Sequence, residues 1–170
     1  MLKKDSGKLN VAFCYDDSLD RQDGVAQYVK TVGAWLSDQG HSVLYLVGET
    51  KLRAWHGAPI YSLAKNRVVD FNGNRVGTPW PASKKNIKSV LAKHQIDVLH
   101  VQMPYSPLFA GRVINLVGPK TAVVGTFHIL PANALVRWGS NLLRLFYLRT
   151  LKRFSRIVSV SLPAAQFARV

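Results

Sequence analysis

The sequence predicts an α/β fold in which helices wind over both faces of a mainly parallel sheet, a doubly wound arrangement. Short apolar runs rich in β-branched residues alternate along the chain with segments whose apolar residues recur at helical spacing. The chain has 170 residues and is 48% hydrophobic, which is enough for one well-buried domain and too little for two. We therefore expect a tail at residues 1–8 and a single domain over residues 9–170.

The first fifty residues predict a βαβ unit. The apolar run at residues 9–14 predicts a strand, and a polar loop follows it. Residues 25–40 show helical spacing and end at Gly40, a residue suited to the left-handed turn after a helix. Residues 41–48 form the next strand, which we expect to pair in parallel with the first through a right-handed crossover.

The remaining elements are predicted in order from the same patterns. Residues 51–81 hold several prolines and glycines, which favour short strands or a hairpin with Asn72 and Gly73 at its tip. Ser83 is expected to cap the helix that follows. Beyond it, strands at 97–103, 121–130 and 156–161 alternate with helical segments at 106–118, 133–154 and 162–170.

Cysteine usage and apolar run lengths indicate a cytoplasmic protein. The one cysteine, Cys14, lies inside the first apolar run and is expected to be a buried hydrophobe, so no disulfide framework is predicted. The first ten residues lack the apolar core of a signal peptide, and no uncharged stretch is long enough for a spanning helix. We expect neither a secreted precursor nor a transmembrane protein.

Charge is distributed unevenly along the chain. There are 23 Lys and Arg against 9 Asp and Glu, and no acidic residue follows Asp97. The C-terminal part is therefore expected to present a positive surface, which attracts nucleic acid, anionic lipid or an acidic partner domain.

Polar residues at strand ends mark the candidate site. Ligands of doubly wound sheets bind at the carboxyl ends of strands, where His128, Gln102 and the loop 16–24 fall. Each has an alternative interpretation: His128 and Gln102 as core groups, and the acidic loop as a solvated turn. The sequence has no phosphate-binding glycine motif and no compact ligand spacing among its five histidines, so we expect no metal and no bound cofactor.

Four segments together carry a family resemblance: 9–47, 96–104, 122–130 and 156–169. In this order they resemble the N-terminal domain of family 4 glycosyltransferases of the GT-B fold, and are most similar to the phosphatidylinositol mannosyltransferase-like group. The resemblance implies a Rossmann-like domain of a retaining, hexosyltransferase-type enzyme. Such an enzyme moves a sugar from a nucleotide-sugar co-substrate to a hydroxyl acceptor, such as a glycolipid or phospholipid. It also implies that the nucleotide-sugar domain lies C-terminal to this chain and is absent from it.

The resemblance also assigns roles to individual residues. His128 corresponds to a histidine that faces the transferred sugar, and Gly24 to a glycine beside the donor diphosphate. Gly24 matches the second of the family's usual pair of glycines and Asp23 stands where the first is usual, so its carboxylate would repel the diphosphate unless it is turned away or paired. Acceptor-side residues are expected to be Asp17, Gln27, Gln102 and Tyr105.

The segment 138–156 suggests a membrane contact. Leucines at 142, 145 and 148 interleave with Arg144, Arg149, Lys152 and Arg153. Apolar and cationic side chains on one helix face suit an anionic lipid surface, here the inner face of the cell membrane. The alternative is that these leucines pack against the missing domain or a second subunit.

Two other functions stay open at this point. The chain could be a stand-alone basic binding module for nucleic acid or another anion, although its aromatics do not interleave with basic residues as a stacking platform requires. It could instead begin a GT-B-like sugar-nucleotide epimerase. The reading frame beyond residue 170 separates these alternatives.

Overall fold

The computed structural model confirms the α/β fold and its mainly parallel sheet. It describes residues 7–71, 74–102, 108–128, 150, 152–162 and 165, without the side chains of 68–78. Seven strands form one sheet in the order β3-β4-β2-β1-β7-β8-β9, and every pair in it is parallel except β3 with β4. The strands are β1 (Asn10–Tyr15), β2 (Ser42–Val47), β3 (Ala54–Trp55), β4 (Ala58–Ser62), β7 (Val98–Gln102), β8 (Ala122–Phe127) and β9 (Phe154–Ser159).

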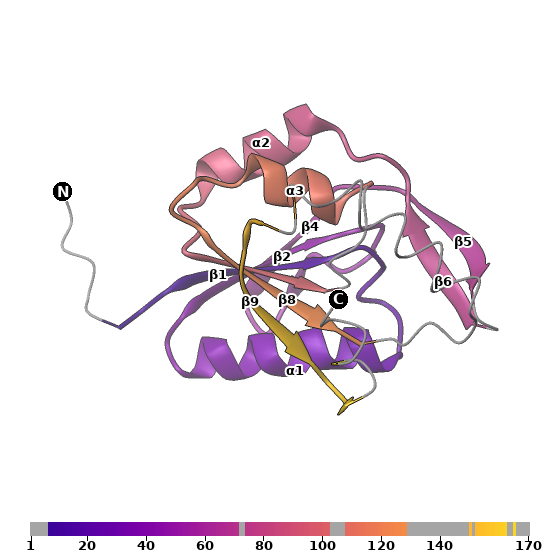
Figure 1. The fold of residues 1–170 in the computed structure, drawn as a ribbon, viewed down its shortest axis with the longest axis horizontal. Coiled ribbons are helices and arrows are strands. Elements are labelled where there is room, and N and C mark those ends of the chain that lie inside the picture. The colour runs from indigo at the N-terminus through magenta and orange to yellow at the C-terminus, as the bar shows by residue number, and fades with distance from the viewer. Residues whose placement is uncertain are drawn as a thin grey trace.

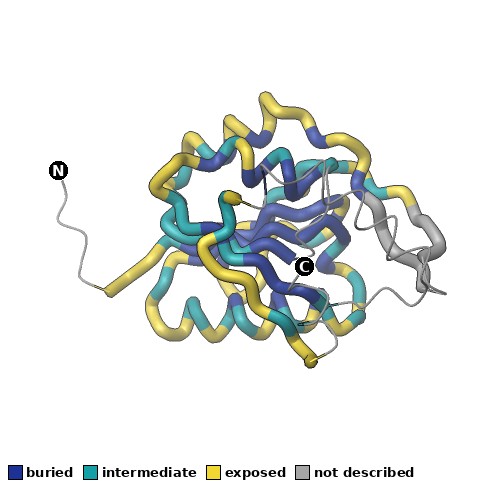
Figure 2. The backbone as a smooth tube through the Cα atoms, in the orientation of Figure 1, coloured by how far each residue is buried: buried dark blue, intermediate teal, exposed yellow. Residues whose placement is uncertain are grey.

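Helices cover both faces of this sheet, as Figure 1 shows. α1 (Gly24–Asp38) lies on one face, and α2 (Lys84–Lys93) and α3 (Ala110–Leu116) lie on the other. Alternation along β1 divides the core between the two layers: Phe13 packs in the cluster on the α1 side, and Cys14 in the cluster on the α2 and α3 side. Cys14 is fully buried, which confirms its packing role. Figure 2 shows buried strands between helices with exposed outer faces.

The strand order creates a switch point at the centre of the sheet. β1 pairs with β2 on one side and with β7 on the other, so the chain winds away from β1 in both directions. In open parallel sheets the crevice for a ligand opens where the winding reverses, at the carboxyl ends of the strands. The carboxyl ends of β1 and β7 are therefore the place to seek the site.

Local signals placed several boundaries correctly. Gly40 follows α1 with φ of 83°, and Ser83 caps α2 by accepting a hydrogen bond from the Asn86 N–H, both as predicted. The N-cap of α1 is Asp23, a role that the sequence analysis did not give it. The expected hairpin is present as β5 (Asn66–Phe71) and β6 (Asn74–Pro79), which are antiparallel. Its tip, residues 72–73, lies outside the described residues.

Other predictions differ from the structure or fall beyond the part that it describes. β3 was not predicted, because two residues carry no periodicity; it pairs with β4 through a tight turn with positive φ at His56 and Gly57. The last described strand begins at Phe154, two residues earlier than expected. Most of each of the predicted helical segments at 133–154 and 162–170 lies outside the described residues; at the end of the first, residues 152–153 form a turn and Phe154 already belongs to β9.

Candidate active site

The strand register brings a row of polar side chains together on the α1 face of the sheet. Gln102 at the end of β7 pairs with Thr126 of β8, and His128 lies two residues beyond Thr126. Because side chains alternate along a strand, Thr126 and His128 share a face. His128 Nε2 lies 2.7 Å from Gln102 Oε1, so two of the residues singled out in the sequence contact each other directly.

His128 is half-buried and held by two contacts. Besides its hydrogen bond to Gln102, its ring meets the ring of Tyr28 on α1 edge to face, with 5.0 Å between the ring centroids. Burial lowers the pKa of His128, and the nearby Asp23 carboxylate offsets part of this effect. A lowered pKa leaves the imidazole neutral at pH 7.

His100 is instead a satisfied core group. Its Nε2 lies 2.7 Å from the Thr126 hydroxyl, and its ring packs against Phe13 and Tyr28. Burial, with a smaller contribution from His128, lowers the pKa of His100 to about 4. The two neighbouring histidines are both uncharged at neutral pH, so they do not repel each other.

Asp23 occupies the N-terminus of α1, where an anion would otherwise bind. Its carboxylate accepts a hydrogen bond from the Ala26 N–H at 2.9 Å, lies 3.4 Å from Arg21 Nε and accepts weakly from the Tyr15 hydroxyl. The carboxylate is therefore paired, yet it uses one of the free N–H groups of the first helical turn. Beside it Gly24 is exposed, and a Cβ built there would meet no atom within 4 Å.

Asp17 stabilises the loop after β1 through the hydrogen bonds of its carboxylate. Its carboxylate accepts hydrogen bonds from the Ser18 N–H, from Arg21 at 2.6 Å and from Asn66 Nδ2 at 3.1 Å. These contacts join the loop to the base of the β5–β6 hairpin. Gln27, the other predicted acceptor residue on this side, is exposed on the first turns of α1.

Asp16 lies at the same end of the sheet, directly after β1, and the sequence analysis gave it no separate role. It is 8% exposed; its Oδ1 accepts a hydrogen bond from the Ala110 N–H at 3.0 Å, and its buried Oδ2 has no partner among the described residues. Burial raises its pKa to about 8; the Ala110 N–H opposes this shift, and the Asp17 charge adds to it. Its position at the end of a buried strand was the available signal, but its partner lies 94 residues away along the chain.

The structure describes only some of the remaining predicted site residues. Tyr105, Arg144 and Arg149 lie outside the described residues, and Lys152 is exposed. Arg153 Nη2 donates to the carbonyl oxygens of Val117 and Gly118, at 3.3 and 2.9 Å. This guanidinium therefore ties the approach to β9 to the end of α3.

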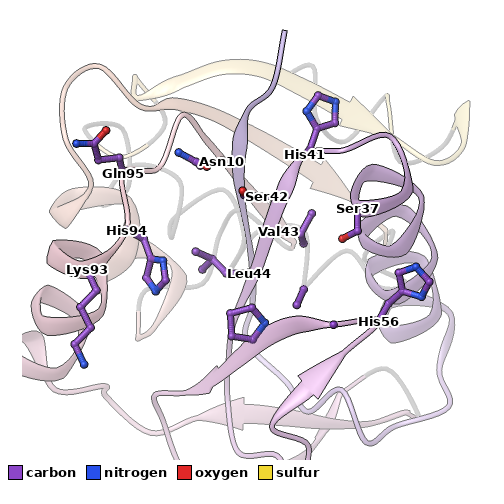
Figure 3. Close-up of a pocket in the computed structure, with 13 residues that line it drawn as sticks. Asn10, Ser37, His41, Ser42, Val43, Leu44, His56, Lys93, His94 and Gln95 are labelled. Atoms are coloured by element: carbon purple, nitrogen blue, oxygen red, sulfur yellow. The ribbon is translucent and has the colours of Figure 1, made fainter. Parts of the chain in front are cut away.

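A cavity of about 650 Å³ opens at the other end of the sheet, among the amino ends of β1, β2 and β4 (Figure 3). Its three histidines already have partners: His41 accepts from the Leu9 N–H, His56 pairs with Asp38, and His94 bonds to the Tyr61 hydroxyl. It contains none of the predicted site residues.

The described part of the chain holds neither a metal-binding cluster nor a membrane-spanning helix. No group of three or more histidine, cysteine or acidic side chains there is arranged to hold a metal ion. No helix in that part is both long and apolar enough to cross a membrane.

Comparisons with known proteins agree with this geometry. The profile of Glycosyltransferase Family 4 matches residues 22–169. A phosphatidyl-myo-inositol mannosyltransferase of Propionibacterium freudenreichii subsp. shermanii is 28% identical over an alignment of 161 residues, and the match covers 89% of this chain and 40% of that protein. This chain thus spans less than half the length of that relative.

Solved structures show the same fold at low identity. The crystal structure of Acinetobacter baumannii MurG aligns with a TM-score of 0.54 at 15% identity, covering 89% of this chain and 41% of that one. An alpha-glucosyltransferase in complex with UDP and a 13-mer DNA aligns with a TM-score of 0.52 at 14% identity, covering 90% and 38%. The fold and the family profile, which covers most of the chain, agree, and the chain belongs to glycosyltransferase family 4.

Proposed function

We propose that this chain is the acceptor-side, N-terminal domain of a retaining glycosyltransferase that moves a sugar from a nucleotide sugar to a hydroxyl acceptor. One observation carries the proposal beyond family membership: His128 and Gln102 are hydrogen-bonded at the carboxyl ends of neighbouring strands beside the switch point. Ligands of this architecture bind at that place. The donor is a co-substrate, and we expect no metal or bound cofactor to be needed.

The proposed role of His128 in sugar transfer fits the environment of its side chain. Sugar transfer passes through positive charge at the anomeric carbon, and preorganised polar groups that face this carbon lower the barrier. A neutral imidazole can hydrogen-bond a sugar hydroxyl without adding a competing positive charge. Burial keeps His128 in that neutral form by lowering its pKa.

The N-terminus of α1 is the proposed neighbour of the donor diphosphate. Gly24 leaves open space beside the backbone, and the first helical turn offers N–H groups and a favourable dipole. Asp23 already caps this turn, so a diphosphate would have to approach alongside the carboxylate or displace it. Asp17, Gln27, Gln102 and Tyr105 are the proposed acceptor-side residues.

The proposed acceptor is a lipid-linked hydroxyl at an anionic membrane surface on the cytoplasmic side. The mannosyltransferase relative is named for phosphatidyl-myo-inositol, which is such an acceptor. The basic residues near β9 and in the segment before it supply the complementary charge.

The test uses the polypeptide encoded by the full reading frame. It is incubated with GDP-mannose, UDP-glucose or UDP-N-acetylglucosamine and vesicles containing phosphatidylinositol, with and without EDTA. We expect transfer from one of these donors, with retained anomeric configuration and no effect of EDTA. The 170-residue chain alone should fold but transfer nothing, and enzyme-like turnover by that chain would overturn the domain assignment.

A further inference from the structure

We propose that Gln102 is a positioning residue that keeps the proton of the neutral His128 ring on Nε2, so that Nδ1 accepts a hydrogen bond from a substrate hydroxyl. The substrate part of this inference rests on the proposed function. The part that concerns the ring and its proton does not, because it follows from contacts within this chain.

The hydrogen bond itself assigns the proton. A carboxamide oxygen only accepts hydrogen bonds, and a neutral imidazole has one donor and one acceptor nitrogen. With the Gln102 amide oriented so that Oε1 lies 2.7 Å from His128 Nε2, the proton of the neutral ring belongs on Nε2. Nδ1 keeps the lone pair, and within the described residues it has no hydrogen-bond partner.

The rest of the Gln102 side chain contributes no other polar contact. Gln102 is fully buried, and its amide nitrogen has no partner among the described residues. Turning the amide over would leave the oxygen unpaired instead and would force the imidazole into its Nδ1–H form, the less favoured form in water. The bond to His128 is thus the one polar interaction that accounts for a glutamine here instead of a leucine.

Both neighbours of the ring are on rigid elements. Gln102 is the last residue of β7, whose register with β8 is fixed by five residue pairs. Tyr28, whose ring meets the imidazole edge to face, is in the second turn of α1. A ring held between a strand and a helix keeps its orientation before substrate binds, which is the condition for electrostatic preorganisation.

The proton position can be measured in this chain without any substrate. In the ¹⁵N-labelled chain at pH 7.5, long-range ¹H–¹⁵N correlations should show His128 in a single tautomer with the proton on Nε2. In Gln102→Leu, exchange of that proton with water should be faster by at least about tenfold, because its acceptor is gone. Gln102→Met serves as a second variant without an acceptor, should the leucine protein fail to fold.

Two controls make the measurement specific. Gln102→Glu keeps an acceptor oxygen, so protection should persist, and its negative charge should raise the pKa of His128. His100 is an internal control in the uncharged variants, because it bonds to Thr126 and exchange of its ring proton should be the same in Gln102→Leu and Gln102→Met as in the wild type. A wild-type His128 protonated on Nδ1, or equal exchange in the leucine variant and wild type, would overturn the proposal.

Kinetic measurements test whether the position of the His128 proton matters for sugar transfer. In the full-length enzyme, Gln102→Leu should lower kcat by about tenfold with little change in KM. In Gln102→Glu the acid limb of the pH–rate profile should move to higher pH, because the neutral ring is the active form. If Gln102 had a merely structural role, the acid limb would stay at the same pH. That result would overturn the positioning role. Absence of transfer by the wild type would count against the proposed function and leave the spectroscopic result standing.

Discussion

Burial has opposite effects on the pKa values of His128 and Asp16, and both side chains become neutral at physiological pH. It lowers the pKa of the imidazole and raises that of the carboxyl to about 8. Each group thereby avoids carrying a charge in a site of low polarity. At the residue scale, the carboxyl end of the sheet therefore carries less charge at physiological pH than its ionisable residues suggest.

Replacing Asp16 tests whether its carboxyl is neutral in the folded state, because the free energy of unfolding then depends on pH. The folded pKa is about 8 and the unfolded one about 3.9. Between these values the folded state binds the extra proton, so this group makes stability fall as pH rises, by up to about 1.4 kcal/mol per unit. Asp16→Asn, which keeps the acceptor for the Ala110 N–H, should therefore match the wild type at pH 4 and exceed it at pH 8.

Urea unfolding at both pH values measures the difference. Comparing variant with wild type removes the effects of other groups, including the lowered pKa of His100, which acts in the opposite direction below pH 6.5. A variant that is less stable than the wild type at pH 8 would mean that folding favours the ionised carboxylate and does not raise the pKa of Asp16.

At the element scale, the capping role of Asp23 at the start of α1 can be separated from its proposed place beside the donor diphosphate. Asp23→Ala removes the cap and should cost about 1 kcal/mol, or about 2–4 °C in Tm for a domain of this size. Asp23→Ser keeps a capping oxygen without the charge and should be nearly as stable as the wild type. If the diphosphate binds here, Asp23→Ser in the full-length enzyme should also lower KM for the nucleotide sugar. An unchanged KM would mean that the donor does not approach this carboxylate.

The same elements show what could be predicted from sequence. Helical spacing, Ser83 and Gly40 predicted α1 and α2 because caps and periodicity are local signals. The hydrogen bond between Gln102 and His128 could not be predicted, since the register of parallel strands depends on contacts far apart in the chain. Asp23 did carry a local signal, an aspartate just before a helix, but the family resemblance led to a role at the diphosphate instead.

At the scale of the whole molecule, the excess positive charge predicts binding to anionic membranes. Vesicles with acidic phospholipid should pellet the protein, and added salt should release it. Changing Arg149 and Lys152 to glutamine should weaken binding by about fivefold for each residue, which is about 1 kcal/mol. Lys93→Gln, an exposed lysine on α2, is the matched control and should bind as the wild type does.

A substitution of Arg153 should affect the stability of the fold as well as lipid binding. Because its guanidinium bonds to the carbonyl oxygens of Val117 and Gly118, Arg153→Gln should lower Tm even without lipid. Equal recovery of the wild type with neutral and anionic vesicles would contradict the membrane prediction.

The most direct test of the whole account is the turnover of His128→Ala in the full-length enzyme. We expect turnover to fall by a factor of about 10²–10³, as for loss of one preorganised transition-state group, with little change in Tm. His94→Ala, which removes a histidine at the opposite end of the sheet, should leave turnover unchanged. A sharp fall in Tm with normal turnover of the folded fraction would show instead that His128 is a packing residue.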